Sequence, residues 1–173
     1  MVQTQNLELM KKNLIPIAAL LLCFTSGCIL AQKNTDQEKN KDFLKAYTED
    51  YWNNHNMAAF DKYFSSDFTC HTAEADMNRE QYMGLCHAYF NDFPDLHITT
   101  HDLIAEGDKV VKVWTAKGTH KGDLMGIPAT GNSINVYGME VFRIKDGKIA
   151  ELWISMDNLG MLQQLGVIPP LGE

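Results

Sequence analysis

The sequence predicts an α+β domain in which about three N-terminal helices pack on one face of an antiparallel sheet. Two observations carry this prediction. Between residues 35 and 94, aromatic and aliphatic side chains recur every three or four positions, as on the buried face of a helix. From residue 96 to residue 157, four segments rich in β-branched and aromatic residues alternate with turn signals, as the strands of an antiparallel sheet do.

Composition restricts the class of protein further. The chain of 173 residues contains 15 Lys and Arg against 22 Asp and Glu, a formal net charge of −7, and 45% of its residues are hydrophobic. These values are typical of a globular domain and not of a disordered segment. The acidic balance argues against a nucleic-acid partner, because nucleic-acid binding requires clustered Lys and Arg.

The first 31 residues have the pattern of a signal peptide with its cleavage region. Lys11-Lys12 precedes an apolar run from Leu14 to Phe24, which is too short to cross a membrane as a helix. The run ends in Thr25-Ser26-Gly27-Cys28, which resembles a bacterial lipobox with Cys28 as the lipidated residue. Cleavage after Ala31 is the alternative and would release a soluble protein.

Both alternatives predict a mature protein outside the cytoplasm, either secreted or in the cell envelope, and we expect a bacterial lipoprotein. The lipid at Cys28 is then its only expected contact with a membrane. Residues 32–40 are polar and predict a tether, residues 41–167 form the expected domain, and residues 168–173 form a tail. Met1 and Met10 are both possible start sites, because Met10-Lys11-Lys12 is an ordinary signal start.

The expected elements follow in order. A period of 3.6 residues over 35–54 predicts the first helix. Asn56 is placed to cap a second, short helix. Asn78, followed by Gln81, is a capping-box pattern that opens the third helix, which Pro94 ends. Strands are expected at residues 68–72, 96–105, 109–120, 133–144 and 148–157, followed by a last helix over 158–165. Hairpin turns are expected at residues 106–108 and 146–147.

Two cysteines remain after the signal peptide, Cys70 and Cys86. An envelope location permits a disulfide between them. The helical spacing of Cys86 with Tyr82 and Tyr89 directs it towards the core, so that two buried thiols are the alternative. Two cysteines without a closely spaced pair give no zinc signature, and we expect no metal or other cofactor.

Motifs spread over residues 40–167 resemble those of the SnoaL-like polyketide cyclases, also described as ester cyclases. They are Phe93-Pro94-Asp95-Leu96, Gly118-Thr119-His120-Lys121-Gly122, Gly126-Ile127-Pro128-Ala129-Thr130-Gly131, Asp146-Gly147-Lys148-Ile149 with Glu151 and Trp153, Asp157, and Gln164-Leu165-Gly166. The resemblance implies a cone-shaped barrel in which a curved antiparallel sheet and the helices enclose an apolar pocket. Ketosteroid isomerase and scytalone dehydratase share that architecture.

The resemblance implies a catalytic role for Asp157. In the cyclases, an aspartate at the end of the last strand is the general acid/base of an intramolecular aldol closure. Alternation places Asp157 on one strand face with Trp153 and Ser155, which we therefore expect in the pocket. Asp157 also stands directly before a helix, so an N-cap is the alternative role. The cyclases use a pocket histidine on the preceding strand; Arg143 is expected in its place, orienting the substrate.

The turn of the last hairpin decides which residues face that strand. A two-residue turn puts Glu140 opposite Trp153. A three-residue turn with a bulge at Gly147 instead puts Tyr137 opposite Ser155. The resemblance favours the bulge, and both Tyr137 and Glu140 are candidates for binding the substrate.

Two histidines complete the candidate site. His71 lies on the short strand from which related domains direct a polar side chain into the pocket; a hydrogen-bonded rim residue is the alternative. His120 belongs to the Gly-Thr-His motif, and we expect it to order the loop that ends at Gly131. No metal ligands are expected among these residues.

These observations predict a domain with a hydrophobic pocket for a small apolar or carbonyl compound, with metal-free acid/base catalysis of the cyclase or isomerase type. A non-enzymatic binding or carrier module is the alternative, and a hydratase or epoxide hydrolase a weaker one. Val111, Val113 and Thr115 alternate with Lys112, Trp114 and Ala116 on one strand, so both faces of this strand are largely apolar and both are expected to be covered, one of them by the helices. The outer face is therefore expected to pack against a second copy in a homodimer.

Overall fold

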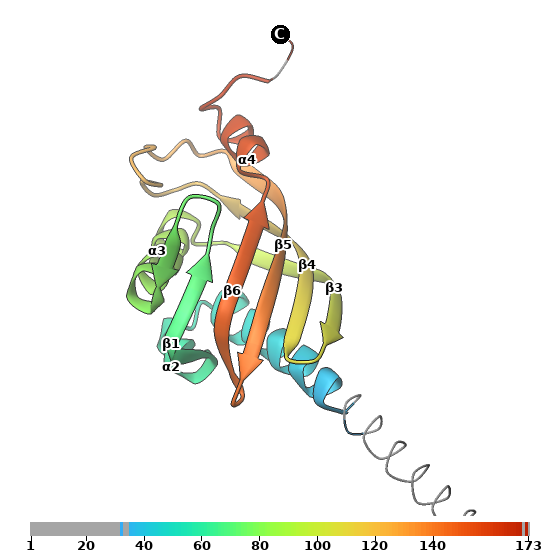
Figure 1. Ribbon diagram of the computed structural model, residues 1–173. Coiled ribbons are helices and arrows are strands. Elements are labelled where there is room, and N and C mark those ends of the chain that lie inside the picture. Colours follow the sequence, from blue (N-terminus) through green and yellow to red (C-terminus); the bar gives the residue numbers. More distant parts are fainter. Residues whose placement is uncertain (1–31, 33–34, 171, 173) are drawn as a thin grey trace, which may run out of the picture. The chain divides into compact units, whose positions relative to one another are not determined.

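The computed structural model describes residue 32, residues 35–170 and residue 172. The chain divides into two compact units, residues 1–36 and residues 37–173, and the second unit contains the sheet and the helices around it (Figure 1). The expected signal peptide and Cys28 lie outside the described residues.

A helix over residues 35–47 continues into the π-helical segment η1 (Thr48–Asn53). The elements that follow are η2 (Met57–Ala59), α2 (Phe60–Tyr63), β1 (Phe64–His71), β2 (Asp76–Asn78), α3 (Arg79–Asp92), β3 (His97–Glu106), β4 (Lys109–Thr119), β5 (Ser133–Lys145), β6 (Lys148–Met156) and α4 (Asn158–Gln164). The expected helices and the four long strands are thus confirmed to within a few residues. The short strand β1 begins four residues before the expected start.

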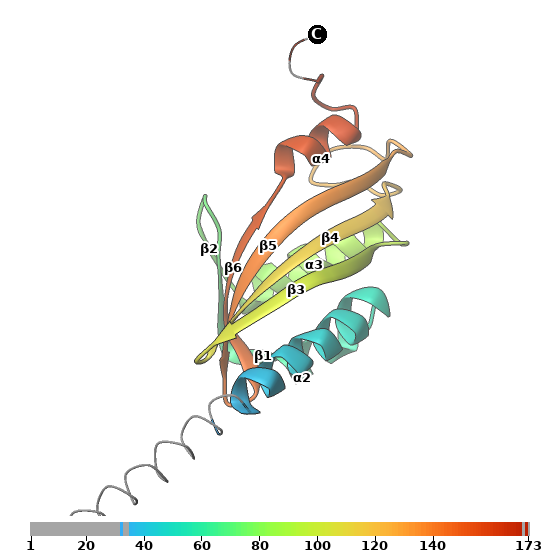
Figure 2. The same ribbon diagram turned by 90° about the vertical axis from the view of Figure 1, so that its right-hand side faces the viewer.

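The six strands form one curved sheet in the order β2-β1-β6-β5-β4-β3. The first helix and α3 lie against the same face of this sheet (Figures 1 and 2). The sheet is mixed and not purely antiparallel, because β1 pairs in parallel with β6. The parallel direction of this pair is possible because a long connection, which contains α3 and the strands β2 to β5, separates β1 from β6.

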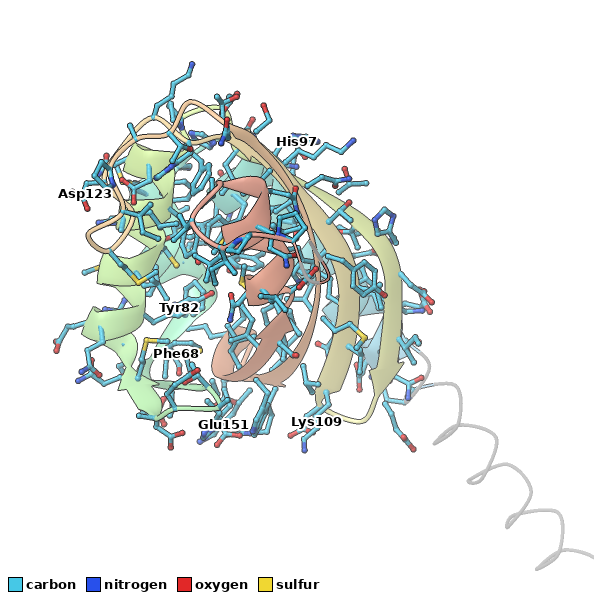
Figure 3. All side chains as sticks on the ribbon, turned by 90° about the horizontal axis from the view of Figure 1, so that it is seen from above. Phe68, Tyr82, His97, Lys109, Asp123 and Glu151 are labelled. Atoms are coloured by element: carbon cyan, nitrogen blue, oxygen red, sulfur yellow. The ribbon has the colours of Figure 1, made fainter. Side chains whose placement is uncertain are left out.

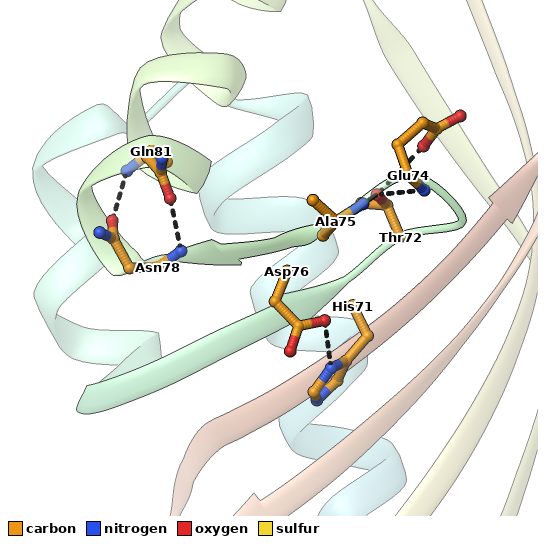
Figure 4. Close-up of polar contacts among 7 residues, drawn as sticks. All are labelled: His71, Thr72, Glu74, Ala75, Asp76, Asn78 and Gln81. Carbon is orange, nitrogen blue, oxygen red and sulfur yellow. Dashed lines mark hydrogen bonds and ion pairs between the residues drawn. The ribbon is translucent and has the colours of Figure 1, made fainter.

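The start of α3 confirms the capping box. The Asn78 side chain accepts a hydrogen bond from Gln81 N at 3.0 Å, and Gln81 Oε1 accepts one from Asn78 N at 2.9 Å (Figure 4). The expected cap at Asn56 is wrong. Its amide donates instead to Asp50 Oδ1 at 2.8 Å, and the short helix begins without a side-chain cap.

The last hairpin has neither of the two expected registers. Its turn has two residues, because Lys145 pairs with Lys148, but a bulge follows at Ala150 on β6. The extra residue shifts all later pairs, so that Glu140 lies opposite Ile154 and not opposite Trp153. The bulge thus lies three residues after its expected position at Gly147. Its position decides which side chains of β6 point towards the inner face of the sheet.

The core is rich in aromatic side chains. The fully buried Tyr47 lies at its centre, with its ring centroid 5.4 Å from that of Tyr63, 5.5 Å from that of Phe64 and 6.0 Å from that of Phe142. Cys70 and Cys86 are both buried and both free thiols. The alternative of two buried thiols is thus the one that the structure adopts. Burial raises the pKa of the Cys70 thiol to about 12.

Candidate functional site

A cavity of about 70 Å³ lies between the helices and the inner face of the sheet. Its lining is almost entirely apolar and aromatic: Trp52, Tyr82, Leu85, Cys86, Tyr89, Leu96, Ile98, Trp114, Ala116, Ile134, Val136, Glu140, Ile154, Met156 and Met161. Figure 3 shows Tyr82 in the space between α3 and the strands. Half-buried side chains of α3 and β6, such as Tyr89 and Met156, mark the side on which the cavity approaches the surface.

Glu140 is the one charged side chain among the described residues that line this cavity, and it is only 4% exposed. It lies on β5, where alternate residues from Ile134 to Ile144 point inward. On the neighbouring strand, Lys112 is its direct partner across the ladder. A carboxylate in so apolar a place requires a counter-charge, because an isolated buried charge is far more costly than a paired one.

Lys112 supplies that charge. Its Nζ lies 2.7 Å from Glu140 Oε2, and the two side chains are 1% and 5% exposed. The ammonium also lies over two rings of the core, 5.6 Å from the centroid of Tyr47 and 5.1 Å from that of Phe142. Lys112 thus lies among aromatic faces that attract a cation, and Glu140, its partner, is the member of the pair that lines the cavity.

Trp114 forms an aromatic wall of the cavity. It is the ladder partner of Gly138, and its indole lies so close to that glycine that a Cβ atom there would meet the ring carbon Cζ2 at 2.3 Å. Only glycine leaves room for this arrangement. The indole Nε1 is buried and has no hydrogen-bond partner among the described residues.

Asp157 does not line the cavity. Its side chain is exposed and caps α4, with Oδ1 accepting a hydrogen bond from Gly160 N at 2.8 Å. A Cβ atom on Gly160 would meet the Asp157 carboxylate at 2.1 Å, so that the glycine permits the tight cap. The structure therefore places Asp157 in the alternative position, as an N-cap.

The expected pocket residues of the last hairpin lie on the wrong face. Trp153, Ser155 and Tyr137 all point to the outer face of the sheet, and Tyr137 is 50% exposed. On β6 the inward side chains are those of Leu152 and Ile154 and of Met156 at the strand end. The placement of Trp153, Ser155 and Tyr137 in the pocket is thus corrected.

Arg143 and His71 also lie away from the cavity. Arg143 Nε donates to Glu151 Oε2 at 2.7 Å on the outer face, and this hydrogen bond, together with the charge of Arg143, holds the pKa of the Glu151 carboxyl below its usual value. His71 Nδ1 contacts Asp76 Oδ1 at 2.8 Å (Figure 4), and the His71 ring stacks on Trp153 with centroids 4.7 Å apart. His71 is therefore hydrogen-bonded, as in the alternative expectation, but it lies outside the lining of the cavity, and Arg143 does not take the place of a pocket histidine.

His120 has a structural position. It is fully buried, its ring stacks on Phe93 at 5.2 Å, and its Nδ1 accepts from Thr130 N at 3.3 Å. Its backbone oxygen accepts from Gly131 N at 3.0 Å, so that the histidine joins both ends of the loop as expected. His120 does not line the cavity.

Glu140 lies in the lining of the cavity, where a residue expected to bind the substrate should lie, whereas Lys112 was not expected at the site. Lys112 and Glu140 are charged residues in the middle of strands, each with hydrophobic neighbours on both sides. Lys112 shares the inward face of β4 with Trp114 and Ala116, and Glu140 points inward on β5. Two buried opposite charges on adjacent strands predict a pair.

Among residues 32, 35–170 and 172, no group of three or more potential ligands is arranged to hold a metal ion. No helix within the described part of the chain is long and apolar enough to span a membrane. The curved mixed sheet and the helices on its inner face define a cone-shaped α+β domain with an apolar internal cavity that one carboxylate lines.

The particular family is shown by comparison with known proteins. Residues 41–165 match the family model of the SnoaL-like polyketide cyclases, and the chain belongs to this family. The matched range lies within the expected domain of residues 41–167. A search of curated proteins finds no significant match.

Solved structures support the same family. IdmH from Streptomyces antibioticus, proposed to be a polyketide cyclase, is 30% identical with a TM-score of 0.64, over 74% of this chain and 99% of that chain. A proposed polyketide cyclase from Acidithiobacillus ferrooxidans is also 30% identical, with a TM-score of 0.66 over 74% and 94% of the two chains. AclR from Streptomyces galilaeus, proposed to be a hydroxylase, is 25% identical with a TM-score of 0.73, over 79% and 91%.

Proposed function

We propose that the domain binds a small carbonyl compound in the inner cavity and that Glu140 transfers a proton from the carbon next to the carbonyl group. The observation that carries this proposal is the carboxylate of Glu140 in an otherwise apolar lining. A carboxylate shielded from water and fixed in position is suited to act as a general base. Membership of the SnoaL-like family supports acid/base chemistry of the cyclase or isomerase type.

The proton transfer needs no further reactant. The Glu140 carboxylate takes the α-proton and becomes a carboxylic acid, while the electrons of the C–H bond form the enolate of the substrate. The enolate then either recovers the proton from Glu140 at another carbon or attacks a second carbonyl group of the same molecule. In the second case a C–C bond forms, the C=O π electrons become an alkoxide, and the alkoxide takes the proton back from Glu140. Lys112, at 2.7 Å, acts as a positioning residue that offsets the charge of the carboxylate between turnovers.

The proposal replaces Asp157 with Glu140 as the proton-transfer group. Asp157 is exposed and already accepts a backbone hydrogen bond as a cap, and it lies outside the lining of the cavity. A carrier that holds an apolar ligand without changing it is the second candidate, and the apolar lining favours it equally. Only the proton transfer distinguishes the two functions.

Exchange of the α-protons of cyclohexanone in D₂O, followed by proton NMR, tests the proposal without knowledge of the natural substrate. We expect the protein to accelerate exchange and Glu140→Gln to reduce the acceleration by at least ~10²-fold. The matched control is Asp157→Asn, which keeps an acceptor oxygen at the cap and should exchange as fast as the unchanged protein. Equal rates for the protein and Glu140→Gln would contradict the proposal and leave the carrier.

Glu140→Gln also leaves Lys112 unpaired, which costs about 3–5 kcal/mol for a buried pair. The double variant Lys112→Met with Glu140→Leu removes both charges and keeps the volume of the core, so it should fold. We expect this variant to retain the melting temperature within a few degrees and to show no acceleration of exchange. A folded double variant with full activity would rule out a role for the pair.

For the location of the protein, we propose the cell envelope, with a lipid at Cys28. The proposal rests on the sequence pattern of residues 1–31. Partitioning of the protein into detergent, lost in Cys28→Ser, tests it. An N-terminus at Gln32 with unchanged partitioning would instead favour ordinary secretion.

A further inference from the structure

The short helix α4 contributes a single side chain to the lining of the cavity. Of the residues of α4, all of which the structure describes, Met161 alone is buried, and it is 4% exposed. Seen from above, the red helix α4 lies in front of the space between α3 and the strands (Figure 3), and the side view places it at the upper end of the sheet (Figure 2). The helix α4 therefore covers one end of that space.

The cavity is too small for a cyclic ligand while Met161 is in place. Its volume is about 70 Å³. An apolar cavity of roughly 150 Å³ holds one molecule of benzene, and a cyclic ketone such as cyclohexanone is at least as large. A lining side chain therefore has to move before such a ligand binds. Met161 is suited to this movement, because methionine is unbranched and flexible and because, unlike Met156, it lies outside the sheet.

The attachment of α4 to the sheet differs from that of the strands that line the cavity. Ladder hydrogen bonds hold the strands, whereas side-chain hydrogen bonds join the far end of α4 to the start of β5. Asn135 N donates to Gln164 Oε1 at 2.6 Å, and Asn132 Nδ2 donates to Leu165 O at 3.1 Å. When these two bonds open, α4 can rotate about Asp157 and no ladder breaks. Leu165 is 1% exposed, and its burial makes the closed position the stable one.

We infer that Met161 is the residue that limits the size of the ligand and that α4 is the entry to the cavity. A cyclic ketone displaces Met161, and α4 turns outward about Asp157, which breaks the bond from Asn135 N to Gln164. Only the open fraction of the protein binds the ligand, so the cost of opening lowers the apparent affinity. The inference rests on the proposed function for the position of the ligand, and not for the proton transfer.

Met161→Ala tests the size limit, because it removes Cγ, Sδ and Cε from the lining. We expect this variant to bind cyclohexanone at least ~10-fold more tightly than the unchanged protein does, and the bulkier α-tetralone with a larger gain. Titrations followed by the methionine methyl signals in ¹³C–¹H correlation spectra measure both affinities. The signal that is absent in Met161→Ala belongs to Met161, and it should shift when cyclohexanone binds to the unchanged protein. Leu159→Ala is the matched control, because Leu159 is 45% exposed on the same helix, so this variant should bind both ketones as the unchanged protein does.

Gln164→Ala tests the entry without changing the lining of the cavity. It removes the acceptor of Asn135 N, so the open fraction should rise and cyclohexanone should bind at least ~3-fold more tightly. The Asn135 amide should also exchange with D₂O at least ~10-fold faster. Gln163→Ala is the matched control, because Gln163 Nε2 donates to Pro169 O at 3.3 Å and not to β5. In the unchanged protein, saturating cyclohexanone should speed the exchange of the Asn135 amide, whereas a rigid pocket would leave it unchanged or slow it.

Three results would overturn the inference: equal affinities of folded Met161→Ala and the unchanged protein for cyclohexanone, a Met161 signal that bound cyclohexanone leaves unshifted, or exchange of the Asn135 amide that cyclohexanone does not speed. The proposed catalysis fails separately. If Met161→Ala and Gln164→Ala bind cyclohexanone more tightly but Glu140→Gln leaves α-proton exchange unchanged, α4 is the entry and the catalysis fails. If exchange depends on Glu140 while neither variant changes the affinity, the catalysis holds and the role of α4 fails.

Discussion

At the scale of single residues, the burial and the partners of a carboxylate decide its role, and its position in a sequence motif does not. Asp157 and Glu140 both carry carboxylates. Asp157 directly follows β6, and Glu140 lies within β5. The first is exposed and accepts a backbone N–H bond, whereas the second is buried and paired with an ammonium group. The proposed proton transfer in a water-poor site therefore requires Glu140, whereas Asp157 caps the start of α4.

The cap makes a separate prediction about stability. Asp157→Ala should lower the free energy of unfolding by about 1 kcal/mol, because Gly160 N loses its acceptor. Asp157→Asn should change it by a few tenths at most, since asparagine caps equally well. Chemical denaturation of the two variants measures both values. A large loss of α-proton exchange in a stable Asp157→Asn variant would instead restore Asp157 as the proton-transfer group.

Asp92, at the end of α3, makes a prediction about pH. Burial raises the pKa of its carboxyl above the ordinary value of 3.8, nearby His120 lowers it, and Asp123 raises it. Because the folded-state pKa lies above the unfolded one, the ionised carboxyl destabilises the fold at neutral pH and stops doing so below 3.8. Asp92→Asn should therefore raise the melting temperature at pH 7.

The advantage of Asp92→Asn should shrink as the pH falls towards 4, because the unchanged protein then carries a neutral acid at this position. Thermal denaturation at a series of pH values measures the difference. A constant difference across the series would show that the substitution acts through packing and not through the charge. Asp95→Asn is a suitable comparison, since backbone and side-chain bonds from Thr119 lower the pKa of Asp95, so this substitution should be destabilising at neutral pH.

At the scale of elements, alanine substitutions at two glycines distinguish the effect of helix propensity on stability from the effect of packing. Gly84 lies within α3, and a Cβ atom there would meet nothing within 4 Å. Gly84→Ala should stabilise the protein by about 0.5–1 kcal/mol, because alanine favours the helix. Gly138→Ala forces Trp114 to move and should destabilise it by about 1–3 kcal/mol.

Denaturation midpoints of the two variants measure these opposite changes in stability. In ¹⁵N–¹H correlation spectra, the indole N–H signal of Trp114 should also shift in Gly138→Ala and stay unchanged in Gly84→Ala. A Gly138→Ala variant as stable as the unchanged protein would contradict the close packing of Trp114 on β5.

The elements themselves could be predicted from the sequence, because their signals are local. The capping box at Asn78, the period of the first helix and the alternation of the last four strands all lie within one element. The register of the last hairpin could not be predicted in this way. A single extra residue at Ala150 reverses the inward face of β6, and no turn motif marks it. The pocket was therefore assigned to the wrong face, although the inner alternation on β4 already contained Lys112.

At the scale of the whole molecule, the outer face of the sheet carries an exposed apolar patch. Val111 pairs with Val141 and with Ile104, and Val113 pairs with Met139, so that these side chains form one apolar patch across three strands. Ile104 and Met139 are 58% and 47% exposed. We propose that this patch packs against the same patch of a second copy, since exposed apolar surfaces of this kind mark interfaces.

Light scattering tests the dimer. The unchanged protein should have the mass of a dimer at micromolar concentration, and Met139→Glu should have that of a monomer with an unchanged fold. Leu159→Glu is the matched control, because Leu159 is 45% exposed on α4 and lies outside the patch, so this variant should remain dimeric. A monomeric mass for the unchanged protein would contradict the proposal.

The central claim is that the working site lies on the inner face of the sheet, at Glu140, and not at the outer end of β6. A crystal structure of the protein soaked with cyclohexanone tests it most directly. We expect the ketone inside the cavity, with its α-carbon near the Glu140 carboxylate. A ketone bound instead beside Asp157 or Trp153, with the cavity unchanged, would contradict it.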